Sequence, residues 1–184
     1  MTQGEAASVL IRGFRLTQNF TYLDLAEKSL EPFFFKIKEG GVQSHLSDGS
    51  IFLEEYPSAT PTHVLNGFMF SLMGLAEFVD ESESEKHRSL LNELIISLNK
   101  NIYLWNTGKW SLYEDPNIAG GKNFCTPSYQ NLQISQLNWL VNRIDNSEIS
   151  AVIHSWEKGV NSLSVRLCAL LGKLYFRLRN KAQR

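Results

Sequence analysis

The chain has 184 residues, of which 43% are hydrophobic and 20% are charged, and its 18 Lys and Arg against 19 Asp and Glu leave a net charge of −1. This composition predicts one globular domain over residues 1–184, and the balanced charge gives no basic surface for nucleic acid. Two cysteines exclude a disulfide framework, and four scattered histidines show no metal-ligand spacing. We therefore expect no metal and no cofactor.

The sequence pattern predicts neither a targeting segment nor a membrane span. The longest apolar stretch, residues 64–78, is interrupted by Asn66 and is too short to cross a bilayer. Residues 2–5 are polar, unlike the start of a signal peptide. Taken as written, the sequence predicts a cytoplasmic protein.

The first two predicted helices form a hairpin. Residues 4–17 place apolar side chains at helical spacing, and residues 18–21 break the pattern. A second helix is predicted over residues 22–35, with Thr21 as its N-cap and the Glu-Gly-Gly run at 39–41 as its end.

The middle of the chain changes from loop to helix. Residues 40–61 are rich in Gly, Ser, Asp and Pro, and short apolar pieces at Val42 and 51–53 predict either extended loops or a small β-hairpin. Residues 64–78 carry almost no charge, which indicates a helix covered on both faces. Residues 84–102 predict an amphipathic helix.

A second loop-rich stretch, residues 106–127, contains a strand-like residue pattern at 110–113. Two further helices are predicted over residues 128–144 and 147–160, with the turn between them at Asp145-Asn146.

The last predicted helix, residues 163–179, has its leucines in one stripe: Leu163, Leu167, Leu170, Leu171, Leu174 and Leu178. The chain is basic from Lys158 onward. Two interpretations of this basic tail stay open, a solvated helix face, which composition favours, and contact with an anionic surface or polymer.

These elements predict an all-α fold of about three helical hairpins with short β-hairpin loops at one end. Low-charge helices begin near residues 4, 64 and 128 and alternate with more charged helices, as inner and outer helices do in an α/α toroid. The connecting loops would line one end, where functional loops often gather. Three hairpins make an incomplete barrel, which a larger toroid or association with another chain would complete.

The junction before the third helix is the first candidate site. It contains Glu-Glu-Tyr-Pro at 54–57, and adjacent carboxylates beside a tyrosine can supply acid and base groups. The alternative, which composition alone favours, makes Glu54 a solvated strand residue and Tyr56 a core ring with a surface hydroxyl. Asn66 is predicted to be a buried amide that binds either a ligand or a neighbouring loop backbone.

The junction before the fifth helix is the second candidate site. It runs from residues 110–113 to 128–131, and Tyr129 opens a helix whose N-terminus favours anions. A simple packing role for Tyr129 is the alternative.

The order of these motifs resembles the C-terminal helical domain of D-glucuronyl C5-epimerases, which convert glucuronate to iduronate in heparosan-type polysaccharides. The resemblance covers about residues 3–160. It is carried by the run from Gln3-Gly4 to Leu16-Thr17, by Glu54-Glu55-Tyr56-Pro57, Pro61 and Val64 to Phe68, by Gly74-Leu75, and by Tyr129 before Gln136-Leu137.

The resemblance implies that Glu55, Tyr56, Asn66, Tyr113 and Tyr129 line an epimerase active site. Inversion at C5 needs one group to remove the proton alpha to the carboxylate and another to deliver a proton from the opposite face. Tyr56 and Tyr129 would be this acid/base pair. Glu55 would be the carboxylate that tunes the tyrosines or shuttles protons. A tyrosine, with an ordinary pKa near ~10, suits both roles if a cation lowers it.

The sequence departs from the family at one position. The family has an arginine three residues after the tyrosine that matches Tyr113, whereas this chain continues Glu114-Asp115-Pro116. An acidic pair there would repel a uronate unless another cation compensates. Arg12 and Lys122 are the candidates, and we expect Arg12 to bind substrate.

The resemblance also implies partners. The expected substrate is a uronic-acid-containing polysaccharide, and the family's β-rich N-terminal region, absent here, or a second copy of the chain would complete the protein. Two expectations follow for the isolated chain, an active enzyme or a domain that is inactive alone. If the chain is a fragment of a eukaryotic enzyme, the expected compartment is the Golgi lumen.

Two alternatives to an epimerase-type isomerase remain. One is a non-catalytic glycan-binding or assembly module in which aromatic rings stack on sugars: Trp105, Trp110, Tyr113 and Tyr129. The other is a different toroid enzyme, either a polysaccharide lyase, which shares the abstraction of the C5 proton, or a glycoside hydrolase.

Overall fold

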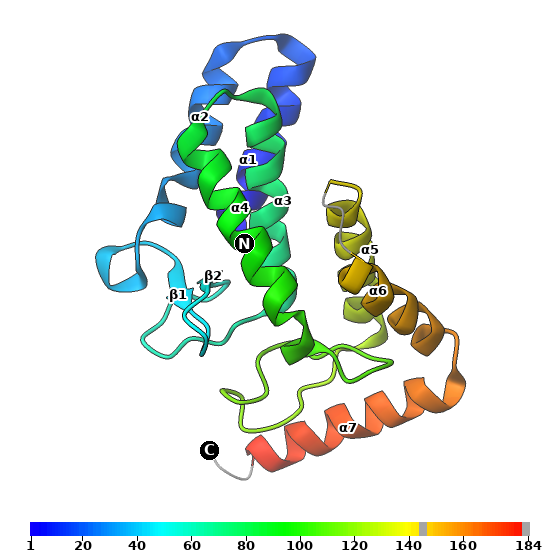
Figure 1. Ribbon diagram of the computed structural model, residues 1–184. Helices are drawn as coiled ribbons and strands as arrows, with labels where there is room; N and C mark the ends of the chain where they lie inside the picture. The colour runs from blue at the N-terminus through cyan, green and yellow to red at the C-terminus, as the bar shows by residue number, and fades with distance from the viewer. Residues whose placement is uncertain (144–146, 182–184) are drawn as a thin grey trace. The chain divides into compact units, whose positions relative to one another are not determined.

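The computed structural model describes residues 1–143 and 147–181, and there the chain is mostly helical, with one short β-hairpin (Figure 1). The α-helices are α1 (Thr2–Thr17), α2 (Phe20–Leu30), α3 (Leu65–Glu81), α4 (Glu85–Asn101), α5 (Pro127–Val141), α6 (Ser147–Val160) and α7 (Leu163–Lys181). Short 3-10 helices are η1 (Glu31–Phe34), η2 (Ile37–Glu39) and η3 (Ile102–Trp105). The mostly helical class is confirmed. The toroid arrangement stays a prediction, and the predicted turn at Asp145-Asn146 lies outside the described residues.

The chain divides into two compact units. The first unit comprises Met1–His63 and Gly67–Leu98, and the second comprises Val64–Asn66 and the chain from Asn99 onward. Each unit is described by itself below. None of the helices in the described ranges has the length and apolar character that crossing a membrane requires.

The pair α1 and α2 opens the first unit. Asn19, not the predicted Thr21, caps α2, because its side chain accepts a hydrogen bond from the Thr21 N–H at 3.0 Å. The predicted second helix is also too long. Pro32 follows the end of α2 at Leu30, and the chain continues as η1, since proline cannot donate the hydrogen bond that an α-helix needs.

The helix α3 crosses α1 at two glycines. A Cβ atom at Gly4 would lie 2.6 Å from the Phe70 carbonyl oxygen, and one at Gly74 would overlap the Gly4 carbonyl. Only glycine permits so close an approach of two backbones. The prediction that α3 is covered on both faces is confirmed, because nearly all of its residues from Leu65 to Val79 are buried.

The predicted β-hairpin is present in the first unit. Strand β1 (Gln43–His45) pairs antiparallel with β2 (Ile51–Leu53), and Ser44 lies opposite Phe52. The Phe52 ring stacks on Phe68 with ring centroids 4.3 Å apart. This contact fixes the end of β2, after which the first candidate motif begins.

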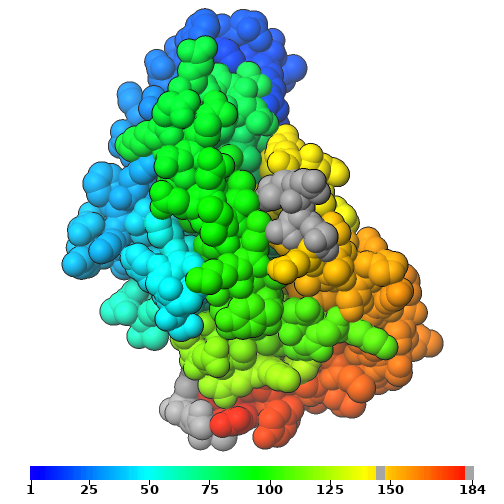
Figure 2. Space-filling model, viewed as in Figure 1, coloured from blue at the N-terminus to red at the C-terminus, as the bar shows by residue number. Residues whose placement is uncertain are grey.

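The second unit contains α5, α6 and α7, where α6 packs against each of the other two. Residues 110–113 do not form a strand. They make isolated bridges, Asn106 to Ser111 and Leu112 to Phe124, within a loop that lies along α7 (Figures 1 and 2). A small core of Trp110, Cys125 and Ala169 joins this loop to α7.

The stripe of leucines on α7 is not the buried face of that helix. Ala169 is buried and Val165 is half-buried against the loop core, whereas the leucines of the stripe are exposed. Helical periodicity identified the apolar face correctly but could not tell which face of α7 meets the rest of the second unit.

Candidate active site

The Glu-Glu-Tyr-Pro motif follows β2 in the first unit, and its first carboxylate is structural. Glu54 is buried and accepts hydrogen bonds from the Ser44 hydroxyl at 2.6 Å and from the backbone N–H groups of Thr62 and His63 at 3.2 and 3.1 Å. His63 also lies 3.3 Å away through Nε2. The interpretation of Glu54 as a solvated strand residue is therefore wrong.

Glu55 lies against the first turn of α3. A Cβ atom at Gly67 would come within 2.5 Å of Glu55 Oε2, so a larger residue at 67 would displace this carboxylate. Oε2 is buried and has no hydrogen-bond partner among the described residues. Negative charge at this end of a helix is favoured by the helix dipole.

Tyr56 is 54% exposed. The alternative that made its ring part of the core is wrong, since the ring as well as the hydroxyl meets solvent. Arg12, the predicted substrate-binding cation of the first unit, pairs with Glu77 at 3.2 Å and leaves most of its side chain exposed. Its role toward a substrate stays a prediction.

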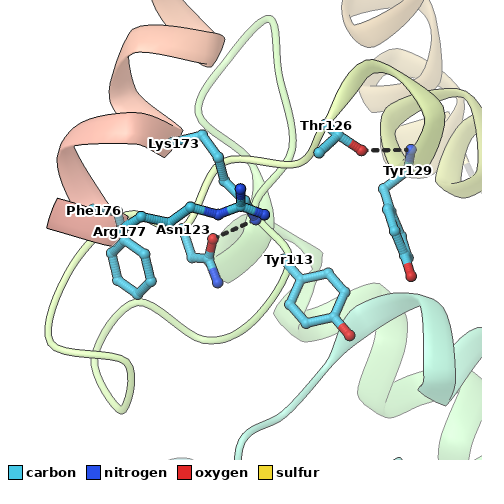
Figure 3. Close-up of a pocket in the computed structure, with 7 residues that line it drawn as sticks. All are labelled: Tyr113, Asn123, Thr126, Tyr129, Lys173, Phe176 and Arg177. Carbon is cyan, nitrogen blue, oxygen red and sulfur yellow. Dashed lines mark hydrogen bonds between the residues drawn. The ribbon is translucent and has the colours of Figure 1, made fainter. Parts of the chain in front are cut away.

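The second unit contains a pocket of about 290 Å³ (Figure 3). Its lining comes from the 106–126 loop, from the start of α5 and from α7: Tyr113, Asn123, Thr126, Tyr129, Lys173, Phe176 and Arg177. The volume is at the lower end of the range for small-molecule sites. Two of the predicted site residues, Tyr113 and Tyr129, therefore line one pocket.

The two tyrosine rings touch. Their centroids are 5.4 Å apart and their planes meet at 89°, an edge-to-face contact. Figure 3 shows both hydroxyl groups turned away from Lys173. Because no sugar ring fits between two rings in contact, Tyr113 and Tyr129 would meet a bound sugar from one side.

A helix cap positions Tyr129, and backbone hydrogen bonds position Tyr113. Thr126 caps α5 by accepting the Tyr129 N–H, and Pro127 occupies the first helical position, so Tyr129 lies in the first turn as predicted. The Tyr113 N–H donates to the Asn123 carbonyl at 2.8 Å, and the Tyr113 carbonyl accepts the Leu65 N–H at 3.2 Å.

Three buried glutamines on α5 hold the segments around the pocket. Gln130 Oε1 accepts from the Ser111 N–H and hydroxyl, Gln133 donates to the Leu112 carbonyl, and Gln136 donates to the Asn66 carbonyl at 3.0 Å. Asn66 is a buried amide, as predicted, and its Oδ1 has no partner among the described residues. Its use by a ligand stays a prediction.

Lys173 brings a positive charge to the pocket. Its Nζ donates to Asn123 Oδ1 at 2.6 Å and lies 5.4 Å from the centroid of the Tyr113 ring, within cation–π range. Burial lowers the pKa of Lys173, and the nearby charge of Arg177 lowers it further. Arg177 itself is exposed at the mouth of the pocket.

The acidic pair after Tyr113 has partners of its own. Asn123 donates through Nδ2 to Glu114, so one amide links this carboxylate to Lys173. Asp115 is buried and accepts the Asn117 N–H at 2.9 Å, which is a turn contact. Lys122, the other predicted compensating cation, is exposed and lines a different pocket.

The proposed sugar-stacking cleft of four aromatic residues is wrong for its two tryptophans. Trp105 and Trp110 are fully buried, and Trp110 Nε1 donates to the Cys125 carbonyl at 2.9 Å. Rings buried to this extent present no face to a ligand. Of that set, Tyr113 and Tyr129 line the pocket of Figure 3.

Sequence reasoning missed the contribution of α7 to this site. Lys173, Phe176 and Arg177 share one helix face because they are spaced by three and four residues. This spacing, on a face of the helix that differs from the leucine stripe, was the signal in the sequence that could have identified these three residues. Composition favours a solvated basic face there, with contact to an anionic surface or polymer as the alternative, because contact with the distant Tyr113 loop has no local signature.

The fold and the pocket together define a helical domain in which two tyrosines and two cationic side chains line a pocket next to a loop. Residues 1–158 match the family model described as D-glucuronyl C5-epimerase C-terminus, and the chain belongs to this family.

Two curated relatives extend the comparison. A D-glucuronyl C5-epimerase of Caenorhabditis elegans is 29% identical over 170 residues, covering 85% of this chain and 27% of the relative. An uncharacterized protein of Methanocaldococcus jannaschii is 22% identical over 161 residues, covering 86% of this chain and 51% of the relative. The chain thus spans about a quarter and about half the length of these relatives.

Proposed function

We propose that this chain is an epimerase-type domain that binds a uronate residue of a polysaccharide and exchanges its C5 proton. The observation that carries the proposal is the pocket of the second unit, where two phenols and two cationic side chains line about 290 Å³. A uronate offers a carboxylate for the cations and a proton alpha to it for a phenolate.

The reaction is a balanced proton exchange. A base removes the C5 proton, negative charge moves onto the neighbouring carboxylate, and an acid returns a proton to the opposite face of the carbon. The charge that develops on the carboxylate must be stabilised in the transition state. Lys173 and Arg177 would supply this stabilisation, in place of the arginine that the family has after its tyrosine.

Tyr129 is the proposed proton carrier on one face. Tyr113, in edge contact with it, would position the sugar and the Tyr129 ring from the same side. Tyr56, with Glu55 beside it in sequence, is the proposed carrier for the opposite face, and Asn66 the proposed ligand contact or loop anchor. The assignment of Glu55, Tyr56 and Asn66 rests on the family resemblance.

Deuterium incorporation tests the proposal. The full chain is incubated with heparosan oligosaccharides in D₂O, and C5 deuterium is measured by mass spectrometry and NMR. We expect incorporation, lowered about 10²–10⁴-fold by Tyr129→Phe, since this change removes a positioned acid/base group and little else. Tyr175→Phe, an exposed tyrosine on α7, is the matched control. A folded chain that incorporates no deuterium contradicts catalysis.

A glycan-binding module without catalysis is the second candidate, favoured by Glu114-Asp115-Pro116 in the place where the family has an arginine after its tyrosine. It predicts binding without exchange, with Tyr129→Ala weakening affinity while Tyr129→Phe does not. The same reaction mixtures detect the remaining alternatives. A lyase would give an unsaturated uronate that absorbs in the ultraviolet, and a hydrolase would give new reducing ends.

A further inference from the structure

The outward face of α7 is the largest row of exposed apolar side chains on any helix in the described chain. Its seven members are between 47% and 74% exposed: Leu163, Leu167, Leu170, Leu171, Leu174, Tyr175 and Leu178. In the space-filling view α7 runs along the surface from orange to red (Figure 2). We call these seven residues the leucine face. Apolar patches of this kind mark interaction surfaces.

The opposite side of α7 fixes the helix in this orientation. Ala169 is buried against Trp110 and Cys125. A Cβ atom at Gly172 would lie 2.6 Å from the Phe124 ring, and Lys173 is hydrogen-bonded to Asn123. Rotating α7 to bury the leucines would break all of these contacts. The leucine face is therefore held outward by the packing of the second unit.

The charges of α7 have one sign. Between Leu163 and Lys181 the sequence has five basic residues and no acidic residue. At helical spacing, Arg166 and Arg177 follow one edge of the leucine face, and Arg179 lies toward the other edge. An apolar face bordered by cations is the pattern of helices that lie in the plane of an anionic bilayer surface.

A second copy of the chain fits this face less well. Two α7 helices packed through their leucines would bring arginines alongside arginines, with no carboxylate on either helix to pair with them. Helix pairs usually place opposite charges at the edges of the apolar seam. The helix also lies beyond residue 158, where the match to the family model ends.

We propose that α7 docks through its leucine face on the surface of a lipid bilayer that contains anionic lipids. The leucines enter the boundary between headgroups and acyl chains, while Arg166 and Arg179 at the edges of the face meet lipid phosphates. This interaction is independent of the proposed enzymatic function.

Vesicle sedimentation tests the proposal. The full chain is mixed with large unilamellar vesicles of phosphatidylcholine alone or with about 30% phosphatidylglycerol, at low and high salt. We expect binding to the anionic vesicles, weak binding to the neutral ones, and a loss of binding as salt rises.

Two variants separate the apolar and electrostatic contributions. The triple change Leu167→Ser, Leu171→Ser, Leu174→Ser should weaken binding at least about tenfold, since three apolar side chains no longer leave water. Arg166→Gln with Arg179→Gln should weaken it by about fivefold for each charge removed. Neither variant touches the pocket residues. The matched control, Val9→Ser, Leu16→Ser, Ile96→Ser, replaces three exposed aliphatic residues of α1 and α4 and should bind like the parent chain.

Circular dichroism of each variant checks that α7 and the remaining helices are intact. Equal binding to both vesicle types, or unchanged binding by the leucine variant, overturns the proposal. Absence of vesicle binding together with a dimer in analytical ultracentrifugation that the leucine variant dissociates also overturns it, and assigns the face to a second copy.

Discussion

The two candidate junctions carry similar residues, carboxylates next to tyrosines, and the structure uses them differently. In the first unit Glu54 is buried in a set of hydrogen bonds from Ser44, Thr62 and His63, and Tyr56 is exposed. In the second unit the tyrosines line a pocket, and the acidic residues are bound by neighbouring amides. Residue type alone therefore does not tell a structural carboxylate from a functional one. The hydrogen-bond partners do.

The largest expected effect comes from removing Glu54. Glu54→Ala leaves two backbone N–H groups and two hydroxyl groups without their buried acceptor, and should lower the free energy of unfolding by about 3–5 kcal/mol. Glu55→Ala, whose Oε2 has no partner in the described structure, should cost less than about 1 kcal/mol.

Urea denaturation measures the difference in unfolding free energy between the two glutamate variants, for each unit separately. All four tryptophans lie after residue 98, so fluorescence follows the second unit while far-UV circular dichroism follows both. A loss for Glu54→Ala as small as the one expected for Glu55→Ala would show that Glu54 is not structural.

A smaller effect is expected for Lys173 in the second unit. Lys173→Met should weaken binding of a heparosan oligosaccharide about 10–100-fold, the range for a hydrogen bond to a charged group. Lys122→Met, in the same loop region but lining another pocket, is the matched control. Isothermal titration calorimetry would give both affinities, and equal affinities would remove Lys173 from the site.

The same interaction should depend on pH. Burial lowers the pKa of Lys173 below its ordinary 10.5, so the side chain loses its charge at a lower pH than an exposed lysine does. Oligosaccharide affinity should fall as pH rises through that lowered pKa, and Lys173→Met should remove this pH dependence.

In the first unit, pH should act on stability through His87. Burial lowers the pKa of His87 from its ordinary 6.5, against a raising effect of Glu27 and with a further lowering effect of Lys86. Its ring packs on Phe34 and Phe78, and Nδ1 lies 2.7 Å from the Ser84 hydroxyl. The unfolded chain therefore binds a proton near pH 6.5 that the folded unit binds only at lower pH.

The direction of the pH effect on stability follows from this difference in proton binding. The free energy of unfolding should fall as pH drops below about 6.5, because the unfolded state then holds more protons. Denaturation by urea at several pH values, followed by circular dichroism, measures the slope. His87→Gln should flatten it, whereas a change at the exposed His154 should not. An unchanged slope in His87→Gln would contradict this role.

The smallest expected effect distinguishes two thiols of the second unit. Burial raises the pKa of Cys125 to about 11, while Cys168 is exposed on α7. A maleimide at neutral pH should label one thiol per chain, and peptide mapping should find the label on Cys168. Rapid labelling of Cys125 would show that the core of Trp110 and Cys125 opens readily.

Much of the fold could be predicted because its signals are local. The hairpin near residues 42–53, the start of α6 at Ser147 and its end at Val160, and the position of Tyr129 in the first turn of α5 all follow from periodicity, caps and turn residues. The boundaries that failed, such as the end of α2, depended on a 3-10 turn around Pro32 that the periodicity did not register.

The sequence by itself determined where the helices lie, which segments carry the family's motifs and which side chains are candidates for proton transfer. Only the tertiary structure decided that Glu54 is a buried anchor, that Lys173 reaches the loop of Tyr113, and that the leucines of α7 face outward. The physical reason is that helix formation depends on neighbours within a few residues. The environment of a side chain depends on segments that are distant in sequence and meet only when the chain packs.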